Sequence, residues 1–317
     1  MVQILAVGEV MVELAPAGEA NGKKLMALGY AGDTYNTSIY LSRLGVHTAY
    51  FTRLGDDLYS REVVQTMQEE GLDTESVEIV SGRTPGLYLI ANQANGERHF
   101  SFWRNQSPAR EMFAATASIA ALEQRLKNVE QVYFSGITLG ILSDDARRDF
   151  MWILQNFRAG GGKVVFDNNY RPQLWRDREQ ARVAMTEALH VTDTALLTDD
   201  DAARLWGSGA TVDVLAMCST AGVAEVVLKC GPNPVQLALR PESGAYAEQY
   251  SVPVPPVSGV VDTTAAGDSF NAGYLSARLR GADPVDAAAF GSRCAGVVIQ
   301  HRGAIVERAI FAAALGP

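Results

Sequence analysis

The strongest constraint on the fold of this chain is a regular alternation of short β-branched runs with amphipathic helical stretches. Residues 3–8 and 48–55 are typical of buried strands, and helices are predicted at 34–45 and 60–71. Four further strands are predicted later in the chain, in the runs QVYFSG, KVVFDNN, TALLTDD and EVVLKCG. This βα spacing predicts an α/β fold, a three-layer α/β/α sandwich around a mostly parallel sheet. Such sheets bind ligands at the carboxyl ends of their strands.

Two segments do not follow this alternation of strands and helices. Residues 9–31 and 84–104 alternate polar and apolar side chains, and Asn95-Gly96 is a strong hairpin signal between two strands. These segments are predicted to pair as a small β-sheet lid over a core formed by residues 1–8, 32–83 and 105–317. An edge extension that serves only contacts between subunits is the alternative.

Composition excludes several classes of protein. The 317 residues carry a formal net charge of −9, and the basic residues form no run. Binding to nucleic acid is therefore not expected, because it needs a local positive field. No apolar run reaches the ~18 residues that would span a membrane. The three cysteines are widely spaced, which fits a reducing compartment. We expect a cytoplasmic protein, and exposed lid edges favour a homo-oligomer, a dimer or larger.

The stretch DTTAAGDSFNAGYL, which begins at residue 262, carries the clearest chemistry. A strand-like GVV precedes it, and a helix is predicted to start at the small residues Ala265, Ala266 and Gly267. Unpaired N–H groups and the helix dipole would make this start an anion hole. Asp268 would then lie beside a bound phosphoryl group and accept the proton of an attacking hydroxyl. The alternative is that Asp268 only complements the helix dipole.

These residues resemble the C-terminal signature of the ribokinase-like (PfkB) carbohydrate kinases. The segment GYAGDTYNTSIYLSRLG, from residue 29, is similar to that family's first signature, and the resemblance runs through nearly the whole chain. It implies a ribokinase-like fold with a lid, ATP as phosphoryl donor and a sugar-like acceptor. It also allows a monovalent cation such as K⁺ at Asp262 and Thr264. We expect Mg²⁺ mainly with ATP, without a dedicated protein cage, because Thr198 and Asp201 replace the family's Asn and Glu.

Within the family, the chain is most similar to the 2-keto-3-deoxygluconate kinase branch. The segments TPGLYLI, FWRNQSPA, FSGITLGILS, FDNNYRPQLW and QHRGAIV carry this likeness. It implies phosphorylation of the terminal C6 hydroxyl of a six-carbon keto acid. An acidic acceptor needs cations, and Arg104 and Arg171 each follow a strand and an aromatic residue. A guanidinium matches a carboxylate with two parallel hydrogen bonds.

The resemblance also distributes roles over the other site residues. Substrate contacts are expected from Gly32, Asp33, Asn36, Tyr88, Phe102, Arg104 and Arg171. Contacts with the nucleotide are expected from Asn169, Arg171, Lys229 and Gly231. Position 102 departs from the tyrosine usual in this branch, so one hydroxyl contact is missing. Thr198 and Asp201 stand where the family has an Asn and a Glu linked to Mg²⁺.

Two other functions fit the same residues. A kinase for a neutral sugar such as fructose or ribose would share the scaffold and Asp268. A non-catalytic sensor of sugar or nucleotide could keep the fold without turnover. A dehydrogenase is disfavoured, because no GxGxxG follows a predicted strand.

Overall fold

The structure is a computed structural model, which describes residues 1–92, 98–207, 210–240, 246 and 248–316. A nine-stranded sheet runs through the centre of the described chain in the order β13-β12-β11-β10-β9-β8-β1-β4-β5. Seven strands are parallel, and β12 and β13 extend one edge in antiparallel pairing. Its members are β1 (Val2–Val7), β4 (Thr48–Gly55), β5 (Val77–Val80), β8 (Val129–Ser135), β9 (Lys163–Asp167), β10 (Thr194–Thr198), β11 (Glu225–Cys230), β12 (Asn233–Leu239) and β13 (Glu248–Val252).

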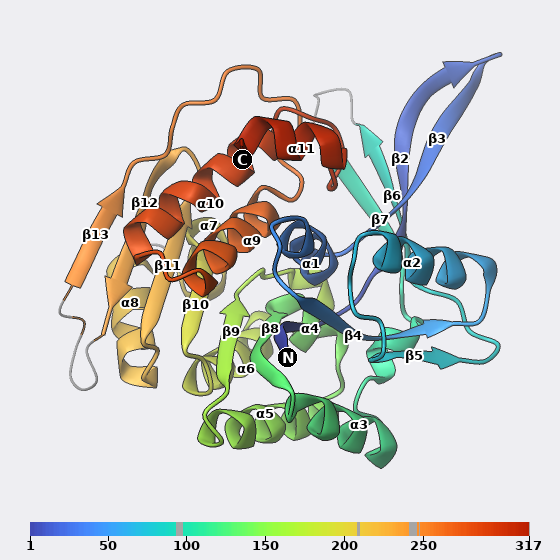
Figure 1. Cartoon of the computed structure of the whole chain (residues 1–317). Helices are drawn as coiled ribbons and strands as arrows, with labels where there is room; N and C mark the ends of the chain where they lie inside the picture. Colours follow the sequence, from blue (N-terminus) through green and yellow to red (C-terminus); the bar gives the residue numbers. More distant parts are fainter. Residues whose placement is uncertain (93–97, 208–209, 241–245, 247, 317) are drawn as a thin grey trace.

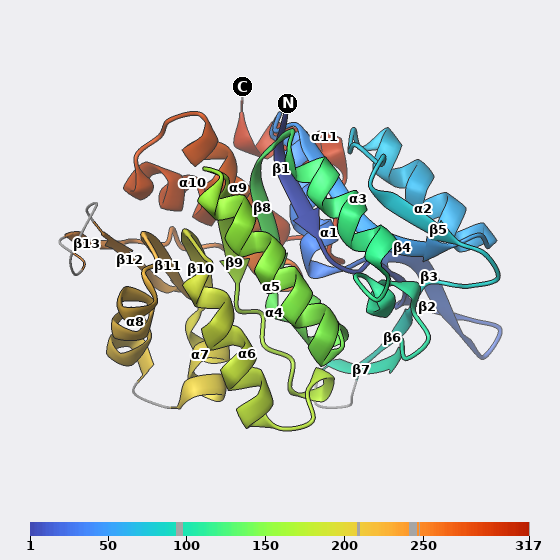
Figure 2. The same ribbon diagram turned by 90° about the horizontal axis from the view of Figure 1, so that it is seen from below.

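Helices cover both faces of this sheet (Figures 1 and 2). One face carries α1 (Asp33–Arg43), α2 (Leu58–Glu69), α9 (Ala266–Leu279), α10 (Pro284–Val298) and α11 (Arg308–Leu315). The other carries α3 (Thr116–Leu126), α4 (Gly136–Ile141), α5 (Asp144–Ala159), α6 (Arg178–His190), α7 (Asp199–Trp206) and α8 (Ala210–Ala221). Two short 3₁₀ helices, η1 (Pro108–Glu111) and η2 (Pro172–Leu174), complete the described elements. The predicted three-layer α/β/α sandwich is confirmed.

The strands are apolar on both faces because each face has its own core. In β1, Ile4 and Ala6 pack into the core under α1 and α9, whereas Leu5 and Val7 pack into the core under α5 and α6. Successive side chains of a strand point to opposite faces, so a strand buried on both sides reads as a continuous apolar run. This explains why the strand runs stand out in the sequence.

A second sheet of four strands, in the order β3-β2-β6-β7, forms the lid. Its β2–β3 hairpin projects from the body of the molecule (Figure 1). At the hairpin tip Asn21 and Gly22 have φ values of 51° and 69°, which asparagine and glycine tolerate best. The predicted turn at Asn95-Gly96 lies outside the described residues. The strands are β2 (Met11–Ala20), β3 (Lys23–Ala31), β6 (Leu87–Asn92) and β7 (Arg98–Trp103).

One local prediction is wrong. Residues 259–261 form no strand before α9, and the Val260 and Val261 side chains are 53% and 52% exposed. A strand needs a neighbouring strand as its partner, but the N–H groups of Val261 and Asp262 both donate to the carbonyl of Ile299. The chain therefore enters α9 from a loop. In the part of the chain that the structure describes, no helix has the length and apolar character needed to cross a membrane.

Candidate functional site

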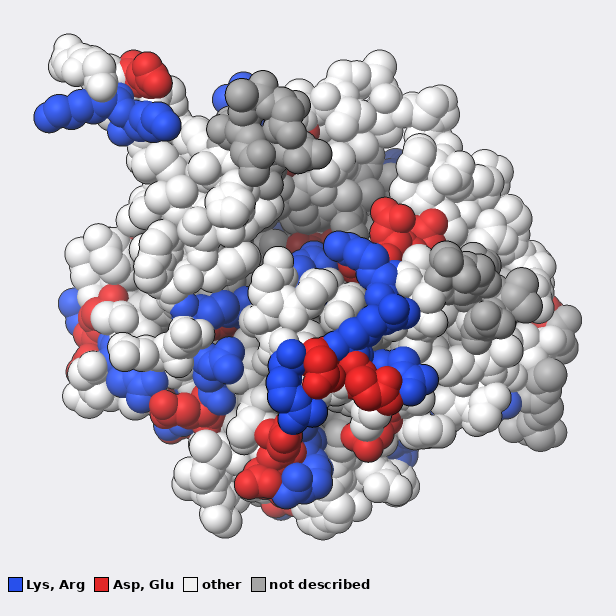
Figure 3. Space-filling view, turned by 180° about the vertical axis from the view of Figure 1, so that it is seen from behind, with Lys and Arg blue, Asp and Glu red and all other residues white. Residues whose placement is uncertain are grey.

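A cleft of about 690 Å³ opens between the lid and the carboxyl ends of the central strands. Figure 3 views the molecule from behind, where Lys and Arg side chains gather beside a hollow. The cleft brings together most of the residues predicted from the sequence, from positions far apart in the chain. Among its lining residues are Gly32, Asp33, Asn36, Tyr88, Phe102, Arg104, Asn169, Arg171, Lys229, Ala265, Ala266, Gly267 and Asp268. Gly231, which follows β11 with a φ of 57°, is not among them.

The first turn of α9 presents both an acid and free backbone donors to this cleft. Ala265 precedes the helix in the left-handed conformation, with a φ of 59°, which is uncommon for a residue other than glycine. A left-handed residue followed by right-handed ones forms a concave nest of N–H groups that suits an anion. The N–H groups of Ala265, Gly267 and Asp268 donate to no residue that the structure describes.

Ala266 corrects the predicted set of donors. Its N–H group is bound to the carbonyl of Thr263 at 3.2 Å, because Thr263 to Ala266 form a tight turn before the helix. The N–H group of Asp268 takes its place among the free donors at the start of α9. Among residues 265–268, the backbone donors without a described partner are therefore those of Ala265, Gly267 and Asp268, and not that of Ala266.

Asp268 is buried, and its side chain is held by α1. The Asn36 amide donates to Asp268 Oδ2 at 2.8 Å. The pKa of Asp268 is raised to about 8, mainly by burial and then by the nearby Asp33 carboxylate, whereas the Asn36 hydrogen bond opposes the shift. A carboxylate with a pKa near neutrality suits proton transfer at ordinary pH.

Asp33 is the second buried acid of the site and begins α1. Its Oδ2 accepts a hydrogen bond from the amide of Asn169 at 2.9 Å. Burial raises the pKa of Asp33 as well. The Asn169 Oδ1 atom is buried and has no partner among the described residues, so the amide is left with a free acceptor beside the cleft. We predicted Asn169 as a nucleotide contact, and the structure places it at the start of α1.

Lys229 lies near the end of β11 and is buried, with only 8% of its surface exposed. Its ammonium donates to Asn271 at 2.8 Å and lies 3.4 Å from an Asp167 carboxylate oxygen. A Cβ atom built on Gly267 would lie 3.6 Å from the Lys229 Nζ atom, so this cation stands directly beside the anion nest. Asn271 also donates to Asp167 Oδ2 at 2.6 Å and fixes both groups.

Three residues of the site were not predicted from the sequence: Asp167, Asn271 and Glu9. Asp167 and Glu9 each end or follow a central strand, so the rule that ligands gather at carboxyl ends could have found them. Asn271 lies one helical turn after Gly267, and its i, i+4 spacing places it on the same side of α9.

The lid contributes an aromatic wall and an arginine. The Tyr88 ring lies 5.8 Å from that of Phe102, and the Tyr88 hydroxyl donates to Glu13. Phe102 is 44% exposed on the cleft side. Arg104 is 7% exposed, and its guanidinium forms an ion pair with the buried Glu9 of the core. The Arg104 Nε atom is buried without a partner among the described residues.

Two arginines share one acid on the opposite wall. Arg171 lies 3.3 Å from Asp201, and Arg204 pairs with the other oxygen of the same carboxylate. The acidic run 199–201 begins α7, and Asp201 within it is buried.

Gly32 shows a packing requirement at the entrance to α1. A Cβ atom at Gly32 would stand 2.1 Å from the carbonyl oxygen of Glu9, so only glycine fits there. Gly32 therefore lets the start of α1 approach the end of β1 beside Asp33.

The donors of the cleft are of the kind that suits phosphate oxygens. The described residues contain no group of three or more His, Cys, Asp or Glu side chains placed to hold a metal ion. Asp262 accepts from the N–H groups of Thr264 and Gly303 at 2.9 and 2.8 Å, and it joins two loops near α9. By contrast, the nest and the Lys229 ammonium are two adjoining features that stabilise phosphate oxygens.

Comparison with known proteins agrees with this geometry. Residues 1–309 match the model of the pfkB family carbohydrate kinases. A 2-dehydro-3-deoxygluconokinase of Dickeya dadantii is 42% identical over 309 residues, which cover 96% of each chain. A fructokinase of Klebsiella pneumoniae is 26% identical, over 86% of this chain and 83% of its own. The solved structure of a putative ribokinase II from E. coli, in complex with ATP and Mg²⁺, superposes with a TM-score of 0.81 at 21% identity, over 96% of this chain and 94% of that one. The predicted ribokinase-like fold is thus confirmed, and the chain belongs to the pfkB family of carbohydrate kinases.

Proposed function

We propose that this protein phosphorylates the C6 hydroxyl of 2-keto-3-deoxygluconate with ATP, giving the 6-phosphate and ADP. This acid is the 2-dehydro-3-deoxygluconate of the relative's name. The relative named for it is 42% identical to this chain, against 26% for the fructokinase. The observation that carries the proposed reaction is the buried Asp268, held by Asn36 beside free N–H groups and Lys229.

The chemistry follows from these neighbours. Asp268 accepts the proton of the C6 hydroxyl as its oxygen attacks the γ-phosphorus of ATP, and ADP leaves on the opposite side. The N–H groups of Ala265, Gly267 and Asp268, together with the Lys229 ammonium, stabilise the charge on the phosphoryl oxygens. When bound with ATP, Mg²⁺ neutralises charge on the β- and γ-phosphates.

Substrate contacts come from both sides of the cleft. Gly32, Asp33 and Asn36 face the acceptor's hydroxyls from α1, and Tyr88, Phe102 and Arg104 cover it from the lid. Arg171 reaches from the opposite wall to both the acceptor and the triphosphate. Lid closure excludes water that would otherwise compete for the phosphoryl group.

The nucleotide and a monovalent cation also bind to residues outside the acceptor site. Asn169 and Gly231 contact the nucleotide, and Asp262 and Thr264 bind K⁺. Exposed apolar side chains of the lid, Leu25 and Leu28 at 46% and 45%, favour association into a dimer or larger. We place the enzyme in the cytoplasm, where ATP is supplied.

The direct test is ADP release from the purified protein with Mg-ATP and each of four acceptors: 2-keto-3-deoxygluconate, gluconate, fructose and ribose. We expect kcat/KM to be highest for the keto acid. Turnover of fructose or ribose alone would replace the proposed acceptor but keep Asp268 as the base. Absence of turnover with all four acceptors would favour a sensor and overturn the proposed reaction.

A further inference from the structure

The cations that line the cleft differ in whether a carboxylate already neutralises them. Arg104 pairs with Glu9, Lys229 pairs with Asp167, and Arg171 and Arg204 share Asp201. Arg110 also lines the cleft, but no described carboxylate pairs with it and no described acceptor receives a hydrogen bond from its side chain. An anionic ligand gains most from a cation that is not already paired.

Arg110 stands on a firmly anchored segment. It belongs to η1, where Ala109 and Met112 are 1% and 0% exposed in the core. The Arg104 carbonyl accepts from the N–H of Ser107, and the Ser107 carbonyl accepts from the N–H of Arg110, at 3.1 Å each. Two consecutive turns therefore carry the chain from the lid strand β7 back into the core, with Arg110 facing the cleft.

The neighbouring acid cannot neutralise Arg110 without breaking other pairs. Glu111 lies 2.9 Å from Arg83 and 3.7 Å from Arg53, both outside the cleft lining. The hydrogen bond from Arg83 lowers the pKa of Glu111, which agrees with these contacts. Arg110 is thus a partly exposed cation of the cleft lining that no described carboxylate neutralises.

We infer that Arg110 binds the carboxylate of the acidic acceptor and is the residue that selects an acid over a neutral sugar. The inference rests on the proposed function and refines it. Arg104, whose charge Glu9 already balances, then contributes orientation through its free Nε, and Arg110 contributes the net charge. We assign the nucleotide phosphates to the nest at the start of α9 and to Lys229 of β11.

The test compares Arg110→Gln with the unchanged enzyme on 2-keto-3-deoxygluconate and on fructose, at saturating Mg-ATP. Loss of one charge-assisted contact should lower kcat/KM for the keto acid about 10- to 100-fold and leave that for fructose within about twofold. Arg110→Lys should recover part of the loss, because it restores the charge without the fork. The KM for ATP should not change.

A matched control is Arg148→Gln, which removes the same charge from an exposed position on α5, where the arginine side chain is 70% exposed. An unchanged kcat/KM for the keto acid in Arg110→Gln would overturn the inference while the proposed function stands. A rise confined to the KM for ATP would overturn it too, since Arg110 would then serve the nucleotide. If the unchanged enzyme does not phosphorylate the keto acid at all, the proposed function fails, and this inference fails with it.

Discussion

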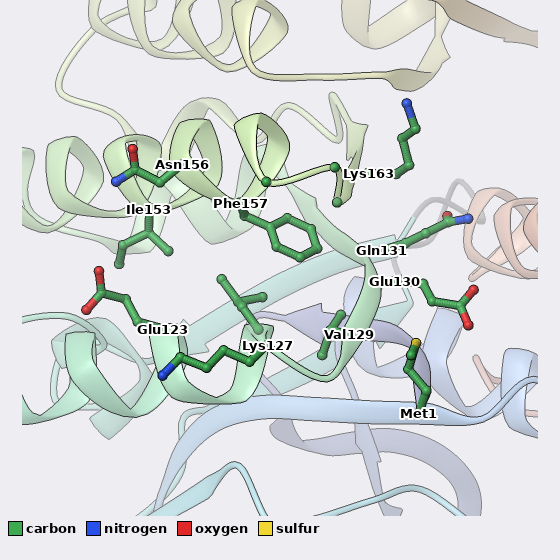
Figure 4. Close-up of a pocket in the computed structure, with 14 residues that line it drawn as sticks. Met1, Glu123, Lys127, Val129, Glu130, Gln131, Ile153, Asn156, Phe157 and Lys163 are labelled. Carbon is green, nitrogen blue, oxygen red and sulfur yellow. The ribbon is translucent and has the colours of Figure 1, made fainter.

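Two hollows of similar size lie at opposite ends of the central sheet, and they differ in how they hold their charges. The cleft at the carboxyl ends measures about 690 Å³, and a groove at the amino ends measures about 650 Å³. Figure 4 shows the groove, with Lys127, Glu123 and Glu130 at its margin and the Phe157 ring within it. Its charged residues are exposed, whereas Asp33, Asp167, Lys229 and Asp268 in the cleft are all buried.

The volume of a hollow alone therefore does not mark a functional site. Exposed charges keep their water and contribute little to binding or reactivity. Buried charges cost stability unless they are paired, and the cleft retains one acid, Asp268, with a pKa raised to about 8. The carboxyl end of the sheet therefore carries groups poised for chemistry, and the amino end carries an ordinary solvated surface.

The largest expected effect is that of Asp268→Asn on turnover. The amide can still accept the Asn36 hydrogen bond but cannot take a proton, so kcat should fall about 10²- to 10⁴-fold. Steady-state ADP release with the keto acid measures the loss. Turnover near that of the unchanged enzyme would show that Asp268 is not the base.

Folding of this variant is checked by its thermal stability against pH. The folded pKa of Asp268 lies above the unfolded value, so the folded state binds the proton more tightly and its stability falls as pH rises from about 4 to about 8. The Asp268→Asn variant has no carboxyl group at this position, so its stability should not fall with pH in this way. Its melting temperature at pH 8 should therefore equal or exceed that of the unchanged protein, and a lower one would mean that the lost turnover has a structural cause.

How far the sequence predicts the site depends on whether a residue acts locally or through distant partners. Asp268 and the small residues before it were recognised because a helix start follows from nearby sequence. The pairing of Arg104 with Glu9 joins the lid to the core over 95 positions, and the Asn271 contact with Asp167 spans 104. No local pattern encodes such contacts, so the Glu9 partner of Arg104 was not predicted and Asp167 was missed.

The same distinction applies to the fold. The central parallel strands were predicted because burial on both faces makes them continuous apolar runs. The edge strands were harder: β13 is largely exposed and resembles a loop in composition, and the supposed strand at 259–261 resembles a strand without having a partner. Strand pairing is a tertiary property, and sequence at the edge of a sheet carries little information about it.

A smaller effect is expected on the pH dependence of the reaction. Since Asp268 must be ionised, kcat/KM should rise with pH and level off near its pKa of about 8. Asp33→Asn removes the neighbouring carboxylate and should lower the pH at which kcat/KM levels off, whereas Lys229→Met should raise it. If kcat/KM levels off at the same pH in both variants, a group other than Asp268 controls the pH dependence.

The smallest effect is expected for substitutions in the amino-end groove. They test whether exposed charges matter less than the buried charges of the cleft. Lys127 is exposed and donates to Gln124 at 2.7 Å, and Glu130 is exposed where β8 begins. Lys127→Gln and Glu130→Gln should change the free energy of unfolding by no more than about 0.5 kcal/mol and kcat/KM by less than about twofold. In each variant, water replaces the contacts that the exposed charge made. Thermal melting and the same ADP-release assay measure both quantities. A tenfold change in kcat/KM from either variant would mean that the amino-end groove is energetically coupled to the cleft through the sheet. The burial of charged groups would then no longer distinguish the functional end of the molecule from the other end.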